Sequence, residues 1–229
     1  MHRKGNLNGP SVLVIEDFLF RRYGDLKWWP SETADEMAIG AILTQNTSWK
    51  NVEKSLSNLR YLDALSCGQI VSMPESELEK AIRSSGFFRQ KSMRIKAMCR
   101  AVYEEFGNFE SMAKIADLEY ARSFLSSLNG IGRETMNSIL LYGLGFPVFV
   151  MDKYTGRIIS RLGYDLEESR KELPEGVIEK ALKHDVPRLR NLHAMFVEVG
   201  KNHCRKSPIC GSCPLEKICD YSGKDEIVP

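Results

Sequence analysis

The chain has 229 residues, of which 43% are hydrophobic, and this is enough for one large domain or two lobes of ordinary size. Its 32 lysines and arginines barely exceed its 30 aspartates and glutamates, so the overall charge excludes a strongly basic or acidic protein, and any nucleic-acid surface has to be local. The N-terminus offers only four consecutive apolar residues before Glu16, which excludes an ordinary signal peptide. The apolar stretch at 139–151 is too short and too rich in glycine and proline to cross a bilayer as a helix. We therefore expect a cytoplasmic protein.

Apolar residues recur at helical spacing along nearly the whole chain. Val52, Leu56 and Leu59 mark one amphipathic helix, and the segment 93–98 marks another. Short breakers that contain Gly, Pro, Ser or Asn separate these segments. The pattern contains no alternation typical of strands, although residues 148–151 fit either a short strand or a buried approach to a helix. The sequence predicts an all-α protein of roughly ten helices.

Two groups of basic residues are candidates to flank a DNA groove. The first lies between Lys80 and Val102 with no acid among its members: Arg83, Arg89, Lys91, Arg94, Lys96 and Arg100. The second lies nearer the C-terminus: Arg188, Arg190, Lys201, Arg205 and Lys206. Such runs are either solvated helix faces or local surfaces for phosphate groups.

Four cysteines near the C-terminus form the pattern C-x5-C-x2-C-x5-C: Cys204, Cys210, Cys213 and Cys219. Without a secretory signal, disulfides are not expected. One alternative is a structural zinc site, but such sites commonly use two Cys-x2-Cys pairs, and this chain has one pair between two longer loops. The other alternative is a [4Fe-4S] cluster held by four thiolates. Cys67 and Cys99 lie in helical patterns and are expected to be small buried hydrophobic residues.

The stretch LNGIGRE, residues 128–134, places two glycines around one isoleucine between two helical patterns. One interpretation is a tight turn, because glycine adopts the positive φ that helix ends need. The other is a phosphate-binding turn, in which backbone N–H groups without intrahelical partners face DNA. Its candidate DNA-binding residues are Gly130, Ile131, Gly132 and Arg133. We expect positive φ in this turn, and we expect a Cβ on Gly132 to intrude where the backbone meets phosphate. A Gly/Pro-rich segment follows, and Asp152 then opens a new helix.

The segment LNGIGRETMNSILLYGLGFPVFVMDKYTGRIISRLG resembles the helix-hairpin-helix, Gly/Pro-rich, aspartate signature of the DNA glycosylase superfamily. The cysteine block resembles the iron-sulfur loop of the endonuclease III branch, with a first cysteine spacing one residue shorter than usual there. The resemblance implies two helical lobes with the active site between them. One lobe is a six-helix barrel at 33–139, which ends in the hairpin at about 120–142. The other lobe joins residues 1–32 to 140–229 and carries a structural [4Fe-4S] loop at 204–219.

The resemblance assigns the chemistry to Asp152, which maps onto the catalytic aspartate of the family. N-capping of the following helix is its simpler role, and both roles can hold, because the helix dipole and Lys153 favour the ionised carboxylate. An ionised carboxylate stabilises the oxocarbenium charge that develops as an N-glycosidic bond breaks. Glu134 stands where bifunctional members carry a lysine that attacks the sugar. A carboxylate cannot form that Schiff base, so the resemblance implies base removal without strand cleavage, unless Lys153 offers the amine.

The stretches KWWP, TQNTSW and SGFFRQK are similar to those of the methylpurine glycosylase subgroup of this branch. In that subgroup the matching aromatic residues help form the base pocket, which implies Trp28, Trp29 and Trp49 here, and Lys201 matches a lysine near that pocket. Core packing is the alternative role of each tryptophan. A purine alkylated at N3 or N7 is cationic, so aromatic faces attract it. Gln45 falls where the branch places a polar residue that enters the gap left by the extruded base, and a surface role is its alternative.

These expectations combine into a monomeric, monofunctional DNA glycosylase of base excision repair. It would remove alkylated purines such as 3-methyladenine from double-stranded DNA that contains a damaged base. Two alternatives stay open. One is an endonuclease III-like enzyme with lyase activity on oxidised pyrimidines. The other is a noncatalytic damage-binding protein that kept the hairpin, and an intact Asp152 argues against it.

Overall fold

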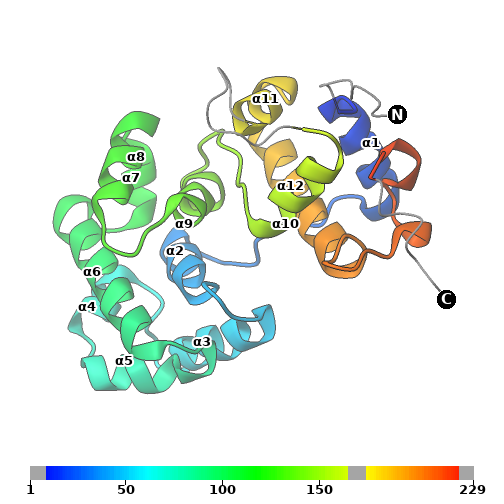
Figure 1. Cartoon of the computed structure of the whole chain (residues 1–229). Coiled ribbons are helices and arrows are strands. Elements are labelled where there is room, and N and C mark those ends of the chain that lie inside the picture. Colours follow the sequence, from blue (N-terminus) through cyan, green and yellow to red (C-terminus); the bar gives the residue numbers. More distant parts are fainter. Residues whose placement is uncertain (1–8, 165–173, 222–229) are drawn as a thin grey trace. The chain divides into compact units, whose positions relative to one another are not determined.

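The regular elements of the chain are helices. The computed structural model describes residues 9–164 and 174–221, and all regular elements in these ranges are helical, which confirms the all-α fold predicted from the hydrophobic period (Figure 1). The segment at 148–151 forms no strand. Its residues Val148, Phe149 and Val150 are instead buried on the approach to a helix. None of the described helices is long and apolar enough to cross a membrane.

The chain divides into two compact units, which we call the terminal unit, Met1–Trp28 with Pro147–Pro229, and the central unit, Trp29–Phe146. The boundaries expected from the sequence, after residues 32 and 139, therefore lie a few residues away from these. The reason lies in the packing of residues 139–146, which belong to the central unit because Ile139, Leu140 and Leu141 are fully buried there. Trp29 also belongs to this unit, since its ring lies against that of Tyr142.

The central unit contains most of the helices. Their bounds are α2 Ala34–Leu43, α3 Trp49–Tyr61, α4 Cys67–Ser72, α5 Glu75–Ala81, η1 Arg83–Ser85, α6 Phe88–Phe106, α7 Phe109–Ile115, α8 Leu118–Ser127, α9 Arg133–Ser138 and η2 Ile139–Gly143. Helix α9 runs directly into η2, a π-helical segment in which the amide of Leu144 donates to the carbonyl of Ile139. Such π-turns within helices occur frequently at functional sites.

Helix α2 is the buried centre of the central unit and packs against α3, α6, α7 and η2. Every residue of α2 after Ala34 is buried, including two acids. The carboxylate of Asp35 accepts hydrogen bonds from the backbone amides of Cys67 (2.6 Å) and Phe109 (2.8 Å), the first residues of α4 and α7. Burial raises the pKa of Asp35, and these two amide bonds act against that rise. The buried acid therefore caps two other helices and fixes them to α2.

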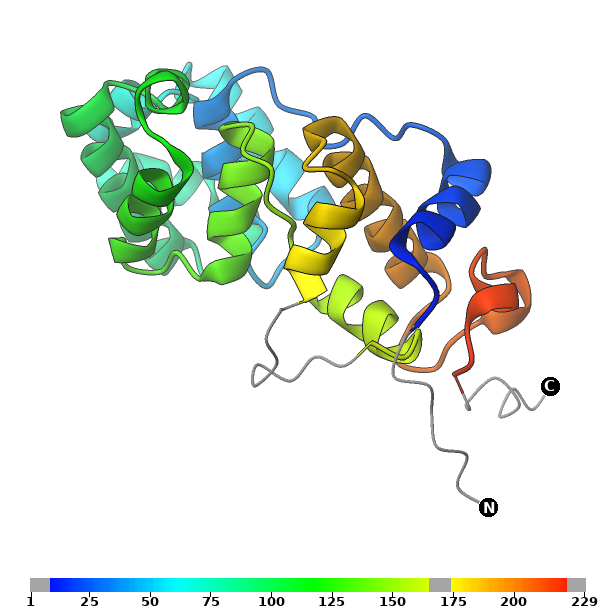
Figure 2. The ribbon, with the colours of Figure 1, turned by 90° about the horizontal axis from the view of Figure 1, so that it is seen from above.

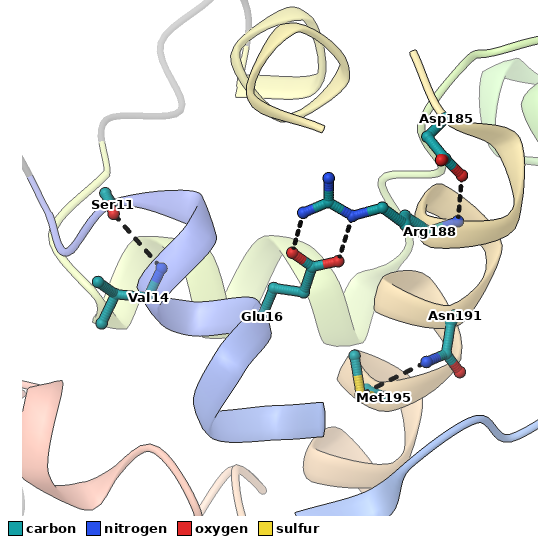
Figure 3. A network of polar contacts seen from close by, with 7 residues as sticks. All are labelled: Ser11, Val14, Glu16, Asp185, Arg188, Asn191 and Met195. Atoms are coloured by element: carbon teal, nitrogen blue, oxygen red, sulfur yellow. Dashed lines mark hydrogen bonds and ion pairs between the residues drawn. The ribbon is translucent and has the colours of Figure 1, made fainter. Parts of the chain in front are cut away.

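The terminal unit contains α1 Val12–Tyr23, α10 Lys153–Arg161, α11 Pro174–Ala181, α12 Val186–Asn202 and the short segments η3 Cys210–Ser212 and η4 Glu216–Ile218. Helix α12 packs against both α10 and α1 (Figure 2). The guanidinium of Arg188 on α12 forks onto the carboxylate of Glu16 on α1, with Nε 2.8 Å from Oε1 (Figure 3). The side chain of Asn191 accepts from the amide of Leu26 and donates to the carbonyl of Gly24, each at 3.0 Å. These bonds fix on α12 the segment that leads from α1 to Trp28.

Candidate functional site

The turn between α8 and α9 needs its glycine at Gly130. Gly130 has a φ of 84°, in the region that favours glycine. Gly132 has an ordinary φ of −79°, and a Cβ built on it would meet nothing within 4 Å. The positive φ expected in the turn is therefore found at Gly130 and not at Gly132. Gly132 is instead the N-cap of α9, where its small size leaves the helix start open to a ligand.

Only one side of this turn is available to a ligand. Ile131 is 7% exposed, and its amide donates to the carbonyl of Leu128 at 3.2 Å, so its side chain anchors the turn in the core. Gly132, Arg133 and Glu134 are exposed. Of the four predicted DNA-binding residues of the turn, Ile131 therefore has both its side chain and its amide engaged within the protein.

Gln45 lies on this turn. The predicted residue follows α2, and its half-buried side chain donates from Nε2 to the carbonyl of Gly130 at 3.1 Å and to Oγ1 of Thr135 at 3.0 Å. The structure thus joins two predicted DNA-binding elements that are 85 residues apart in the chain. The side chain of Gln45 is therefore engaged in tertiary contacts at the end of α2.

The basic run at 83–100 is not one continuous surface. Lys91 is 1% exposed, and its Nζ donates to the carbonyl of Leu43 at the end of α2 (2.8 Å) and to the carbonyl of Ser85 (2.7 Å). Burial, followed by the charge of Arg94, lowers the pKa of Lys91 to about 8. Lys96 likewise donates to backbone carbonyls, at Val71 and Met73. Three of the six basic residues, Arg83, Arg89 and Arg100, are exposed.

Phe87 is a candidate contact residue that the sequence did not single out. It is 64% exposed and has a φ of 46°, so a large apolar side chain is presented to solvent from a left-handed backbone. Gly86 before it also has positive φ, at 68°. Phe87 lies in the stretch SGFFRQK, which the sequence did mark, although not at this residue.

Asp152 is the N-cap of α10, and one of its carboxylate oxygens lies near a buried histidine. Oδ1 accepts from the amide of Thr155 at 2.7 Å, which confirms the predicted N-cap. Oδ2 lies 3.9 Å from Nε2 of His193 on α12. Lys153 is exposed. The sequence analysis missed His193, since a lone histidine in an apolar helix carries no signal without its partner.

The predicted pocket residues form two separate pairs. In the central unit, the ring of Trp29 lies edge-on to Trp49, with centroids 5.3 Å apart, and tilted to Tyr142 at 5.7 Å. In the terminal unit, the ammonium of Lys201 lies over the ring of Trp28, 5.3 Å from its centroid. All three tryptophans are half-buried.

Three residues of the second basic group bind other residues of the terminal unit. Arg188 is bound to Glu16, and Lys201 Nζ lies 3.4 Å from Glu198 Oε1. Arg205 Nε donates to the carbonyl of Lys201 at 2.8 Å. These contacts leave less free positive charge than the sequence suggested.

The four predicted metal-binding cysteines are half-buried, and none of the described cysteines is joined in a disulfide. Burial raises the pKa of the Cys213 thiol to about 11, and the charges of the other three cysteines act in the same direction. Among the described residues, no group of three or more His, Cys, Asp or Glu side chains is arranged to hold a single metal ion.

Two arginines of α10 bind the start of this cysteine loop. Arg157 Nε donates to the carbonyl of Cys204 at 2.7 Å, and Arg161 Nη1 lies 3.2 Å from the Cys204 Sγ. Arg161 also donates to the carbonyl of Arg205 at 2.7 Å. Because Asp152 caps the same helix, one short element carries both the candidate catalytic carboxylate and the anchors of the loop.

The chain is similar to known DNA repair proteins over most of its length. Residues 39–183 match the family model described as HhH-GPD superfamily base excision DNA repair protein. A Methanocaldococcus jannaschii protein named "Putative DNA repair glycosylase MJ1434" is 42% identical over 209 residues, which are 91% of this chain and 95% of that protein. Endonuclease III of Thermotoga maritima is 29% identical over 193 residues, 82% of this chain and 85% of the enzyme.

Two solved structures extend the comparison. The H. pylori 3-methyladenine DNA glycosylase MagIII bound to 1,N6-ethenoadenine has a TM-score of 0.71 at 27% identity and covers 84% of this chain and 98% of its own. A non-covalent endonuclease III–DNA complex has a TM-score of 0.73 at 24% identity and covers 94% of this chain and 96% of its own, which shows a shared fold.

Proposed function

Because the chain belongs to the HhH-GPD superfamily of base excision DNA repair proteins, the family of helix-hairpin-helix DNA glycosylases, we propose that it removes alkylated purines from double-stranded DNA and leaves the abasic strand uncut. The observation that carries the proposal is the chemistry of two positions. Asp152 offers a carboxylate for hydrolysis, and Glu134 puts a second carboxylate, not an amine, after the hairpin turn. We propose that the protein acts as a monomer.

Asp152 would stabilise the sugar as the glycosidic bond breaks. Its Oδ1 is held by the first turn of α10, where it accepts from the amide of Thr155. The fixed carboxylate can then oppose the positive charge that develops on the sugar and orient the attacking water through Oδ2. Because the carboxylate of Asp152 is already held in place, it does not have to reorient when positive charge develops on the sugar.

The aromatic residues support an alkylated purine as the extruded base. Trp29, Trp49 and Tyr142 give the central unit a cluster of half-buried and buried rings, and aromatic faces attract cationic methylpurines. Trp28 differs, because the ammonium of Lys201 already lies over its ring and would repel a second cation. We therefore assign charge-dependent attraction to Trp29 and Trp49. Likeness to a 3-methyladenine glycosylase over 98% of that chain also supports this substrate class.

The cysteine loop supports a bound [4Fe-4S] cluster. Cys204, Cys210, Cys213 and Cys219 would hold it, and a donor set of four thiolates suits iron-sulfur chemistry. The buried hydroxyl of Tyr23 has no hydrogen-bond partner among the described residues. Burial raises the pKa of Tyr23, and Cys213 contributes to that rise. A cluster held by the cysteines would therefore give the Tyr23 hydroxyl a polar group to contact. Such a cluster would be structural, stabilising the loop at 204–219 that α10 anchors.

A second candidate function is that of an endonuclease III-like lyase acting on oxidised pyrimidines. Endonuclease III enzymes are among its relatives, at 29% identity for the Thermotoga maritima enzyme, and the exposed amine of Lys153 directly follows Asp152.

A panel of defined lesion duplexes tests both functions. Duplexes with 3-methyladenine, 7-methylguanine, 1,N6-ethenoadenine or thymine glycol are incubated with the protein, and products are compared with and without alkaline treatment. We expect strand breaks only after alkali and only with the purine lesions. Breaks without alkali on thymine glycol would favour the lyase, and no excision of any lesion would contradict both.

A further inference from the structure

Both the nitrogen and the oxygen of the Gln45 side-chain amide form hydrogen bonds within the protein. While Nε2 donates to Gly130 and Thr135 of the hairpin, Oε1 accepts from Nη1 of Arg94 on α6 at 2.8 Å. A guanidinium can only donate, so Oε1 has to face Arg94 and the amide has one orientation. The side chain of Gln45 is therefore fixed between α6 and the hairpin before any DNA is bound.

Arg94 reaches Gln45 through space that the hairpin leaves open. A Cβ on Gly130 would lie 2.5 Å from Cδ and 2.8 Å from Cγ of Arg94, closer than side chains approach one another. Gly130 is thus required for two reasons: its positive φ and the passage of the Arg94 side chain. The first glycine of the turn serves contacts inside the protein.

One face of α6 binds both ends of the segment 43–45. Lys91, one turn before Arg94, donates to the carbonyl of Leu43, while Arg94 binds the side chain of Gln45. Two residues three positions apart on a helix lie on the same face. The segment after α2 is therefore held at its start by Lys91 and at its end by Arg94.

We propose that Arg94 is a positioning residue, which holds Gln45 on the hairpin so that the two contact DNA as one preorganised unit. Its guanidinium acts through Gln45 and is not itself a phosphate contact. A side chain that is ordered before binding loses less conformational entropy when the complex forms. The inference rests on the proposed function, because it takes Gln45 and the hairpin as the DNA-contacting elements.

A double-mutant cycle tests this coupling. Binding to an undamaged duplex and to an abasic-analogue duplex is measured for Gln45→Ala, Arg94→Met, Arg94→Lys and the double variant Gln45→Ala/Arg94→Met, at several salt concentrations. Loss of a hydrogen bond to a charged group predicts that each single change weakens binding by a factor of roughly ten. We expect the double variant to bind no more weakly than the weaker single variant. We expect Arg94→Lys not to restore binding, because the shorter lysine side chain does not bring its ammonium to the position of Arg94 Nη1.

The salt dependence separates the positioning role from a phosphate contact. Loss of one phosphate contact lowers the slope of log K against log salt by about one, so an unchanged slope for Arg94→Met supports the proposal. Arg100→Met, an exposed change of the same charge on the same helix, is the matched control. Additive losses, a lower slope and rescue by lysine would together overturn the inference, as would unchanged binding in all variants.

Two further measurements keep the result interpretable. Thermal unfolding identifies any variant that loses its fold, and Thr135→Val replaces Arg94→Met in the cycle if the latter does not fold, since it removes another hydrogen-bond partner of Gln45 at nearly constant volume. Failure of the proposed function is a separate outcome: it appears as absent excision by the wild-type protein, whereas failure of this inference leaves excision intact.

Discussion

Asp152 and His193 lie 3.9 Å apart, from Oδ2 to Nε2, within the terminal unit. His193 is 4% exposed and lies edge-on to the ring of Phe149, with centroids 6.2 Å apart. Burial lowers the pKa of His193, and the carboxylate of Asp152 opposes that shift without overcoming it. The candidate catalytic carboxylate thus has a neutral imidazole beside it at neutral pH, so its negative charge is not already neutralised when the sugar becomes cationic.

The first prediction is that Asp152→Asn abolishes most base excision without abolishing DNA binding. Asparagine caps helices about as well as aspartate, so α10 should keep its start and thermal stability should change little. Single-turnover excision of 3-methyladenine should fall by a factor on the order of a hundred or more, the scale expected when one electrostatic stabiliser is lost. Excision close to the wild-type rate would mean that another group carries the charge stabilisation.

The second prediction concerns the pH dependence of stability. Because the folded-state pKa of His193 lies below the unfolded value, the unfolded chain binds a proton that the folded chain does not, and the free energy of unfolding falls as pH decreases through about 6.5. One such proton changes that free energy by at most about 1.4 kcal/mol per pH unit. His193→Gln should reduce this slope, measured by denaturant titration between about pH 5 and 8. His203, whose pKa burial also lowers, should retain part of it.

His184→Gln is the matched control, because His184 is exposed between α11 and α12. The slope of His193→Gln is compared with that of this variant. An equal slope in the wild type and in His193→Gln would show that His193 titrates alike in the folded and unfolded chains, contrary to its burial.

The third prediction separates the two glycines of the hairpin. Gly130→Ala should destabilise the fold, because alanine strains a φ of 84° and its Cβ would collide with Arg94. Gly132→Ala should leave thermal stability nearly unchanged, since nothing lies within 4 Å of its Cβ, but it should weaken binding to damaged and undamaged duplexes alike. A loss of affinity confined to one lesion would indicate that the turn reads bases.

The helices and the N-cap were predictable because they depend on local pattern. The period of apolar residues and an aspartate before Lys153 are properties of neighbouring positions, and the structure reproduces both. The role of Lys91 was not predictable. Its two carbonyl partners replace water around a buried ammonium, and one of them is 48 positions away in the chain.

The same limit applies to the candidate site. Type and order of residues pointed to Asp152, but not to His193, which is brought beside it only by the packing of α10 on α12. For the same reason the sequence could not show which glycine of the hairpin makes room for Arg94. Contacts between distant segments decide these roles, and a single sequence does not display them.

The fourth prediction is that the purified protein contains about four irons per chain, as a [4Fe-4S] cluster requires. Elemental analysis checks this, and zinc in place of iron would contradict it. Cys210→Ser should lower both iron content and soluble yield, because metal binding and local folding are coupled. Cys99→Ser, a change at a buried cysteine of the central unit, is the control and should retain the iron.

The fifth prediction is that the wild-type protein forms no covalent adduct with an abasic duplex under borohydride. Trapping requires an amine that attacks the sugar to give an imine, which borohydride then reduces. The exposed Glu134 cannot do this. Glu134→Gln should therefore leave excision largely intact, whereas Glu134→Lys supplies an amine after the hairpin turn and should yield a trapped adduct if this position reaches the sugar. The exposed amine of Lys153 is the competing nucleophile, and Lys153→Ala is the variant that identifies it. A strong wild-type adduct that disappears in Lys153→Ala would move the chemistry to the lysine beside Asp152 and make the protein a lyase.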